Sequence, residues 1–173
     1  CALAATALET LHAAGQEHGL KLCGMHMKDS CRIEKGFRHF GQDITSEDHV
    51  LEAGLGFAVS KTKDSFIGRD AVNKKRDEGL KTRMVQFKLT DPNPLLYHNE
   101  PILRDGEIIG FLSSGNYGHT LGGAIGMGYV PCQGQTIADI LASTYEIDVA
   151  GTRVRAEASL KPMYDPTGER TRQ

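Results

Sequence analysis

One carboxylate, Glu34, has a local setting that suits the binding of a small molecule. It lies near the end of the segment Asp29-Ser30-Cys31-Arg32-Ile33-Glu34-Lys35-Gly36, where the glycine lets a second backbone or a flat ligand come close. A carboxylate there could accept two parallel N–H bonds, as from a guanidine-like group or a 2-aminopyrimidinone edge. The alternative is a surface glutamate paired with Arg38 four residues further on, and the residues alone favour it.

A second candidate is the polar, glycine-rich stretch 113–123, which carries Tyr117 and His119. It lies between two apolar runs and is predicted to be a flexible loop joining two strands. Glycine-rich loops between strands often face a ligand, and they are as often plain turns. Both interpretations stay open for this stretch.

A third feature is the basic segment 61–83, which holds eight Lys or Arg residues against four Asp or Glu residues. Most runs of this kind are solvated helix faces. The alternative is a binding site for an anion such as a phosphate or a carboxylate.

Several common catalytic and metal-binding patterns are absent. The sequence has no G-x-G-x-x-G, Walker, G-x-S-x-G or H-E-x-x-H motif. Its seven histidines are scattered, so the fold would have to assemble any metal site. No C-x-x-C pair occurs, and free thiols in a reducing compartment are expected for all four cysteines, Cys1, Cys23, Cys31 and Cys132.

Length and charge narrow the function classes further. The chain has 173 residues and a net charge of −2, which argues against nucleic acid or an anionic membrane surface as the main partner. No apolar run approaches the roughly 20 residues that span a bilayer. A soluble domain with a core of its own is therefore expected.

The first half of the chain is predicted to be mainly helical. Apolar residues at helical spacing predict a helix over 2–18, ended by Gly19. A short strand is expected over 21–27, followed by a helix with Asp29 and Ser30 as candidate N-terminal caps. A second short strand is expected around 55–59 and a basic helix within 66–81.

The second half is predicted to be mainly β. Alternating residues predict a strand from residue 83, and Asp105–Gly106 predicts a tight hairpin. A glycine-rich strand over 122–130 and two strands about Ala150–Gly151 follow, with a helix over 136–143. Six or so short strands predict a small closed antiparallel barrel. The boundary between the two parts is expected near residue 82, which predicts domains over 1–82 and 83–173.

These segments together resemble the aminomethyltransferase family, which includes the glycine cleavage T-protein and the C-terminal folate domains of sarcosine and dimethylglycine dehydrogenases. The similar segments are DSCRIEKGFRHFGQDIT, LEAGLGFAVS, FIGRDAV, PILRDGEIIG and SSGNYGHTLGGAIGMGYV, in that order. The ending SLKPMYDPTGERTR resembles the dehydrogenases in particular. Mild departures are Phe40 for a usual Trp, Cys31 for a common Leu, and Val50–Leu51 for a frequent Pro.

The resemblance implies an α+β fold in which part of a folate-binding α/β lobe is followed by the small barrel. It implies that Glu34 holds the pterin ring of tetrahydrofolate, which reverses the surface interpretation of this residue. Basic residues would hold the benzoylglutamate tail, with Lys61, Lys63 and Arg83 as candidates, and Tyr117 could face the folate channel. The family's catalytic Asp belongs to a first folate lobe that no segment here matches, so no catalytic residue is assigned.

The resemblance also implies a longer parent protein, an FAD-dependent dehydrogenase of N-methyl amines. Its folate domain would capture the one-carbon unit as 5,10-methylenetetrahydrofolate, in bacterial cytoplasm or the mitochondrial matrix. The flavin domain and first folate lobe would lie outside this chain, which is expected to be inactive alone and to expose apolar surface. The alternatives are a T-protein aminomethyltransferase, a folate-dependent methyltransferase or demethylase, and a non-catalytic module of the same fold.

Overall fold

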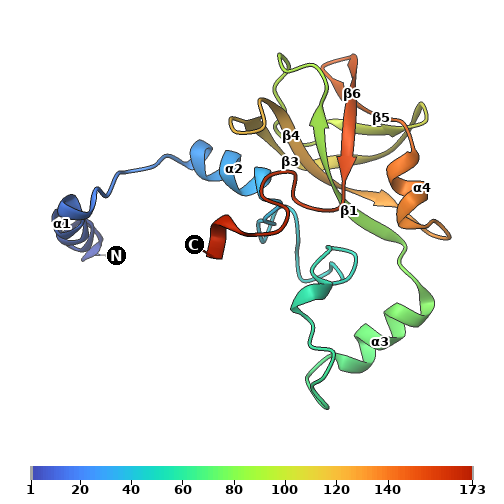
Figure 1. Cartoon of the computed structure of the whole chain (residues 1–173), viewed down its shortest axis with the longest axis horizontal. Coiled ribbons are helices and arrows are strands. Elements are labelled where there is room, and N and C mark those ends of the chain that lie inside the picture. Colours follow the sequence, from blue (N-terminus) through green and yellow to red (C-terminus); the bar gives the residue numbers. More distant parts are fainter. Residues whose placement is uncertain (1, 173) are drawn as a thin grey trace.

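A closed β-barrel with attached helices makes up the computed structural model, which describes residues 2–172 (Figure 1). The helical elements are α1 (Ala4–Gly15), η1 (Gln16–His18), α2 (Met25–Glu34), η2 (Gly56–Ala58), α3 (Arg69–Glu78), α4 (Ile137–Ala142) and η3 (Arg170–Arg172). The strands are β1 (Thr82–Leu89), β2 (Pro101–Arg104), β3 (Glu107–Gly118), β4 (Gly123–Pro131), β5 (Tyr145–Val149) and β6 (Thr152–Ser159). The predicted α+β class is confirmed. No helix within residues 2–172 has both the length and the apolar character needed to cross a membrane.

The barrel closes in the order β1-β4-β3-β2-β5-β6, with antiparallel neighbours throughout, and β6 pairs back with β1. Its tight turns are those predicted from the sequence. Asp105 and Gly106 have φ values of 54° and 91°, as a two-residue hairpin turn requires, and Ala150 and Gly151 have 52° and 86°. The closed antiparallel barrel and both hairpins are confirmed.

Alternate residues of β1 fill the barrel interior. Val85, Phe87 and Leu89 are fully or almost fully buried there, and the Phe87 and Tyr145 rings lie 5.3 Å apart at their centres. Residues from the other strands and from α4 complete this core, among them Ile102, Leu112, Val130, Ile140 and Ile147. Each buried side chain of this size contributes about 1.5–3 kcal/mol through removal of apolar surface from water.

The outer face of β1 is also buried, because the end of α2 and the C-terminal tail lie against it. Ile33 of α2 forms a second apolar cluster with Met84, Ile125 and Met127. Gln86 lies on the same outer face, where its Nε2 donates to the carbonyl oxygen of Ile33 at 2.6 Å. Its Oε1 accepts from the backbone N–H of Met163 at 2.8 Å, so one side chain joins helix, strand and C-terminal tail.

The start of the chain departs from the predicted order. The helix is confirmed as α1, and Gly19 has the expected left-handed φ of 71°. The predicted strand over 21–27 is wrong: residues 20–24 have no regular structure, and α2 begins at Met25. Asp29 and Ser30 lie inside α2 and not at its cap, because Asp29 accepts from Arg32 and the Ser30 hydroxyl donates to the carbonyl of Tyr117.

Two further predictions are corrected. The strand expected around 55–59 is a 3₁₀ turn, η2, and the basic helix is confirmed as α3. Residues 113–118 belong to β3, so the predicted long loop shrinks to a turn over 119–122. The polar side chains that suggested a loop are instead satisfied inside the fold, since Ser113 and Ser114 both donate to Asp43.

Candidate functional site

Glu34, the last residue of α2, turns its carboxylate toward the turn between β3 and β4. Its Oε1 accepts the backbone N–H groups of Thr120 at 2.7 Å and Leu121 at 2.9 Å. Glu34 is only 3% exposed, so the surface pairing with Arg38 is wrong. The carboxylate does accept two N–H bonds, but both come from the protein backbone.

The second oxygen of Glu34 has no such partner. None of the hydrogen bonds among residues 2–172 reaches Oε2. Gly118 lies against the same side chain, where an added Cβ would approach Oε1 to 3.1 Å. A held carboxylate with one oxygen available is an acceptor for a ligand N–H group.

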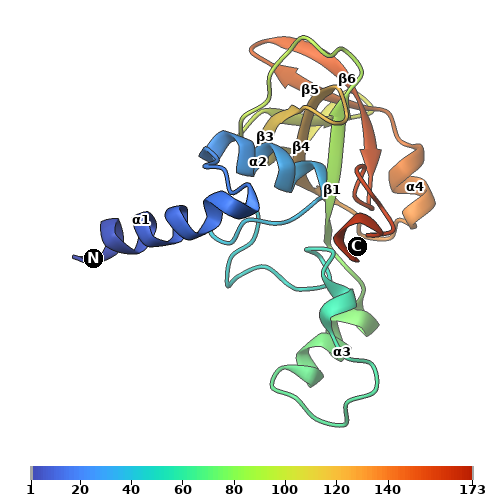
Figure 2. The same cartoon turned by 60° about the vertical axis from the view of Figure 1, so that its left-hand side comes forward.

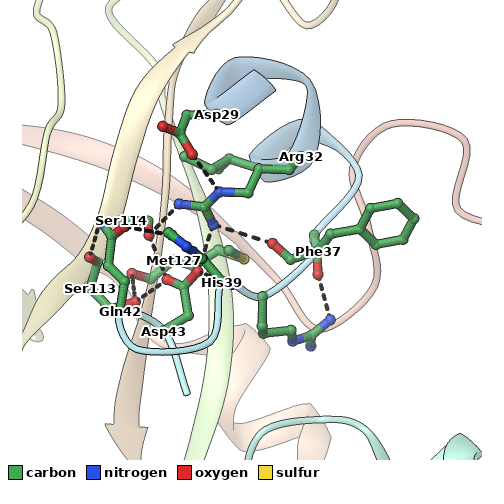
Figure 3. Close-up of polar contacts among 12 residues, drawn as sticks. Asp29, Arg32, Phe37, His39, Gln42, Asp43, Ser113, Ser114 and Met127 are labelled. Atoms are coloured by element: carbon green, nitrogen blue, oxygen red, sulfur yellow. Dashed lines mark hydrogen bonds and ion pairs between the residues drawn. The ribbon is translucent and has the colours of Figure 1, made fainter. Parts of the chain in front are cut away.

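A buried ionic network fastens α2 and the loop after it to the barrel (Figure 3). The Arg32 guanidinium donates to Asp29 at 2.8 Å, to Asp43 at 2.5 Å and to the Ser114 hydroxyl at 2.8 Å. The Asp43 side chain is fully buried and also accepts from Ser113 and from the backbone of His39. The Asp29 pKa is lowered, chiefly by the hydrogen bond from Arg32.

This network holds Glu34 indirectly. Arg32 and Glu34 lie on the same last turn of α2, so a helix fastened through Arg32 fixes where Glu34 points. Sequence reasoning passed over Arg32 and Asp43. Their opposite charges within one motif were the only local sign that they interact. Their shared partner, Ser114 on β3, lies about 70 to 80 residues further along the chain.

The C-terminal tail folds back over the end of α2. The backbone N–H of Tyr164 donates to the carbonyl of Glu34 at 3.2 Å, and the Lys35 ammonium pairs with Asp165 at 2.6 Å. The hydrogen bond from Lys35 to the Asp165 carboxylate is the main reason why the pKa of Asp165 lies below its usual value. The segment on both sides of Glu34 is therefore held by the tail as well as by the barrel.

A cavity of about 460 Å³ opens beside this segment. Its apolar lining comes from the loop after α2, from the 51–57 segment and from the tail, and comprises Phe37, Ile44, Leu55, Phe57, Leu160 and Pro162. Three cationic side chains also line it, those of Lys35, Arg38 and Lys161. An apolar cavity with cations suits a flat ligand that carries negative charge.

Arg38 is built into the wall of this cavity. Its Nε donates to the carbonyl of Ala53 at 2.9 Å and its Nη1 to that of Gly36 at 2.5 Å. An added Cβ on Gly54 would lie 2.7 Å from Arg38 Nη2, and Gly54 has a φ of 72°, so both the contact and the backbone favour glycine here. Burial lowers the pKa of Arg38, while the nearby Asp43 carboxylate opposes that effect.

Comparisons with known proteins identify the family of the chain. The sequence profile described as "GCVT N-terminal domain" matches residues 2–63. The profile described as "Glycine cleavage T-protein C-terminal barrel domain" matches residues 82–165. The chain belongs to the glycine cleavage T-protein family.

Relatives in this family carry two kinds of name. A 4-methylaminobutanoate oxidase (formaldehyde-forming) of Paenarthrobacter nicotinovorans is 42% identical over 171 residues, which are 98% of the chain and 20% of the oxidase. Human mitochondrial sarcosine dehydrogenase is 35% identical, over 92% of the chain and 18% of the dehydrogenase. An aminomethyltransferase of Halothermothrix orenii is 43% identical over 122 residues, 70% of the chain and 34% of that enzyme. The chain thus spans about a fifth of the first two relatives' length.

A solved structure agrees with the T-protein fold. The crystal structure of glycine cleavage system aminomethyltransferase T from Bartonella henselae superposes with a TM-score of 0.77, covering 95% of the chain and 45% of that protein. Their sequence identity is 23%, so this likeness speaks for the fold alone.

The site residues suggested by the family resemblance do not all lie together in the structure. Tyr117 lies at the end of β3, half-buried, next to the turn that Glu34 holds, and its ring meets His119 edge-on at 5.2 Å. Lys61 and Lys63 are exposed in the connection before α3, at the end of the molecule remote from the barrel (Figures 1 and 2). Arg83 is half-buried at the start of β1. Only Tyr117 is thus brought near Glu34.

The cysteines and histidines form no site in the described part of the chain. Cys23 and Cys31 are exposed free thiols and Cys132 is a buried one; Cys1 lies outside the described residues. Within residues 2–172 no group of three His, Cys, Asp or Glu side chains could hold a metal ion.

Proposed function

We propose that this chain is the tetrahydrofolate-binding part of a flavoprotein that oxidises N-methyl amines. Two relatives that match 98% and 92% of the chain are named for 4-methylaminobutanoate and for sarcosine respectively, both N-methyl amines. The proposed role is capture of the one-carbon unit as 5,10-methylenetetrahydrofolate. Tetrahydrofolate supplies two amine nitrogens, N5 and N10, which bind a carbon at the oxidation level of formaldehyde.

The observation that carries this proposal is the held carboxylate of Glu34. Since Oε1 is occupied by Thr120 and Leu121, Oε2 is the oxygen that would accept from the N–H edge of the pterin. Tyr117 lies at the same turn and would border the pterin, while Lys61, Lys63 and Arg83 are the proposed contacts of the acidic tail. FAD would lie outside this chain, and no catalytic residue is assigned within it.

Glu34→Gln tests the role of the carboxylate without removing its structural bonds. The Gln side-chain oxygen can still accept from Thr120 and Leu121, but an NH₂ group then replaces Oε2 and opposes the N–H donors of the pterin. In the full-length protein, which would supply the flavin domain and the first folate lobe, we expect at least tenfold weaker tetrahydrofolate binding, unchanged amine oxidation, and release of the one-carbon unit as formaldehyde. Glu107→Gln, at an exposed position of the β2–β3 hairpin, is the matched control.

A loss of amine oxidation with unchanged folate affinity in Glu34→Gln would contradict the pterin role. The second candidate function is aminomethyl transfer, favoured by the 43% identity to an aminomethyltransferase. Amine-dependent reduction of a redox dye separates the two, because only an oxidising flavoprotein shows it. A protein that binds no folate and oxidises no amine would favour the non-catalytic alternative.

A further inference from the structure

The chain leaves the barrel at the end of β6 and continues as a tail over residues 160–172. The pairing of β6 with β1 ends at Ser159, so no strand pairing holds the tail. It runs from the end of β6 toward the end of α2 (Figure 1). Lys161 and Pro162 line the cavity beside Lys35, so the tail forms one wall of that cavity.

Two backbone hydrogen bonds attach the middle of the tail. The N–H group of Met163 donates to Gln86 Oε1 at 2.8 Å, and that of Tyr164 donates to the Glu34 carbonyl oxygen at 3.2 Å. Residues 160–169 form no helix or strand of their own. A segment tied down by so few bonds can open while the rest of the fold stays intact.

A buried ion pair is the third attachment. The Lys35 ammonium donates to Asp165 Oδ2 at 2.6 Å and to the Asp165 carbonyl oxygen at 2.5 Å. The two side chains are only 11% and 8% exposed, and neither has another ion-pair partner within residues 2–172. Loss of one partner would leave the other charge buried and unpaired, so this pair is the strongest of the three attachments.

The turn after Asp165 prepares this residue for the ion pair. Asp165 has a left-handed backbone with a φ of 45°, which Asp and Asn adopt more readily than most residues. Its Oδ1 accepts from the backbone N–H of Glu169 at 2.9 Å, and its carbonyl oxygen accepts from that of Gly168 at 3.0 Å. Contacts within the tail therefore fix the carboxylate and leave Oδ2 for Lys35.

Two of the three attachments end on neighbouring residues, Glu34 and Lys35. Release of the tail would free the backbone at the end of α2, where Glu34 holds Thr120 and Leu121. It would also remove a wall of the cavity that Lys35 lines and leave the ammonium there without its counter-ion. Opening of the tail would thus disturb the Glu34 carboxylate and the cavity together.

We propose that residues 161–165 are a strap that opens and closes over the end of α2 and the adjoining cavity, with the Lys35–Asp165 pair as its latch. Through this latch, Asp165 is a positioning residue for the Glu34 carboxylate. The effect on a ligand of Glu34 rests on the proposed function, whereas the opening of the strap does not.

Hydrogen exchange of the full-length protein, followed by mass spectrometry of its peptides, tests the strap without a ligand. Amides of residues 161–165 should exchange at least about a hundredfold faster than those of β1, because the strap opens while the barrel stays folded. Asp165→Asn keeps the backbone conformation but loses the charge, and should speed exchange of the strap about tenfold. Glu169→Gln is the matched control, since this exposed side chain of the same tail joins no ion pair within residues 2–172.

Asp165→Glu guards against a folding defect, because it keeps a carboxylate and should restore part of the slow exchange. Equal exchange of the strap and of β1 in the wild type overturns the proposal, since the tail then opens only when the barrel unfolds. Equal exchange of the strap in wild type and in Asp165→Asn also overturns it, since the ion pair is then not the latch.

Dissociation of tetrahydrofolate from the full-length protein tests the link to Glu34. Asp165→Asn should release tetrahydrofolate severalfold faster than the wild type, because the end of α2 is then held less firmly. Amine oxidation per bound flavin should stay unchanged, whereas a general loss of folded structure would lower it. Glu169→Gln should release tetrahydrofolate at the wild-type rate.

The two measurements keep the strap separate from the folate proposal. A wild-type protein that binds no tetrahydrofolate counts against the proposed function, and the exchange rates then decide the strap by themselves. Normal binding with equal dissociation from wild type and from Asp165→Asn overturns the positioning role of Asp165 and leaves the folate function standing.

Discussion

The barrel and the segment before it are held together by different forces. Residues 82–159 enclose a continuous apolar core to which every strand contributes, and Phe87 is fully buried in it. Among the described residues 2–81, the buried apolar side chains are Ile33, Ala53 and Val72, and α1 has none. Figure 2 shows α1 projecting away from the barrel, with α3 at another end of the molecule.

In the first region polar contacts take the place of a core and form a polar seam between α2, its following loop and β3. Arg32, Asp43 and Ser30 fasten α2 and its following loop to β3, and Glu34 holds the β3–β4 turn. The cavity beside Lys35 opens next to these contacts, where Lys35, Phe37 and Ile44 line it. The barrel therefore supplies a rigid surface. The segment before it, which has few buried apolar side chains of its own, carries the groups that would meet a ligand.

The largest expected effect comes from the barrel core. Phe87→Ala should lower the free energy of unfolding by about 3–5 kcal/mol, because the side chain is fully buried and leaves a cavity. Urea denaturation followed by circular dichroism measures it. Phe57→Ala, at a position 84% exposed, should change stability by about 0.5 kcal/mol or less. Similar losses in the two variants would refute the contrast between the regions.

Substitutions in the polar seam should have the next largest effect on the free energy of unfolding. Asp43→Ala leaves the buried Arg32 guanidinium without its main partner and should cost about 3 kcal/mol. The same denaturation experiment applies, with Asp29→Ala as the control that removes the more exposed partner of Arg32. If Asp43→Ala proved as mild as Asp29→Ala, the network would not be what joins α2 to the barrel.

A smaller effect with a distinct pH dependence is expected at the tail. Because Lys35 lowers the pKa of Asp165, the pair stabilises the fold at and above neutral pH and loses this contribution as pH falls below about 4 through the lowered pKa. Asp165→Asn should therefore lower the Tm at pH 7, and the gap to wild type should narrow in acid. A gap that stays constant from pH 7 to pH 3 would rule out the ion pair as its cause.

The smallest effect is expected at α1. Leu11→Ser, at a position 67% exposed, should alter the free energy of unfolding by no more than about 0.5 kcal/mol in the described chain. A loss near that of Phe87→Ala would mean that α1 packs against other protein in solution, and that the first region contributes more to stability than its contacts indicate.

Much of the barrel was readable from local sequence. The Asp105–Gly106 pair and Gly151 predicted the two turns, because Gly and Asp adopt positive φ at low cost. The alternation of Val85, Phe87 and Leu89 predicted which side of β1 faces inward. The helix over 136–143 was also predictable from near neighbours, because Thr136 and Asp139 cap it reciprocally within one turn.

The polar stretches misled the same reasoning. Ser113 and Ser114 suggested a loop but belong to β3, since Asp43 accepts both hydroxyl groups. Gln86 should have faced water by alternation, yet α2 and the tail cover it. In each case a residue more than 50 positions away supplies the partner, and no local pattern records that partner.

By itself, then, the sequence determined the periodicity, the turns and the closed barrel, because these depend on spacing between near neighbours. Tertiary structure alone decided that Glu34 is buried and that one of its oxygens accepts from Thr120 and Leu121. The family resemblance pointed to Glu34, but which oxygen remains for a ligand follows only from how α2 docks against the barrel. That docking depends on the register of the strands and on contacts between residues far apart in the chain.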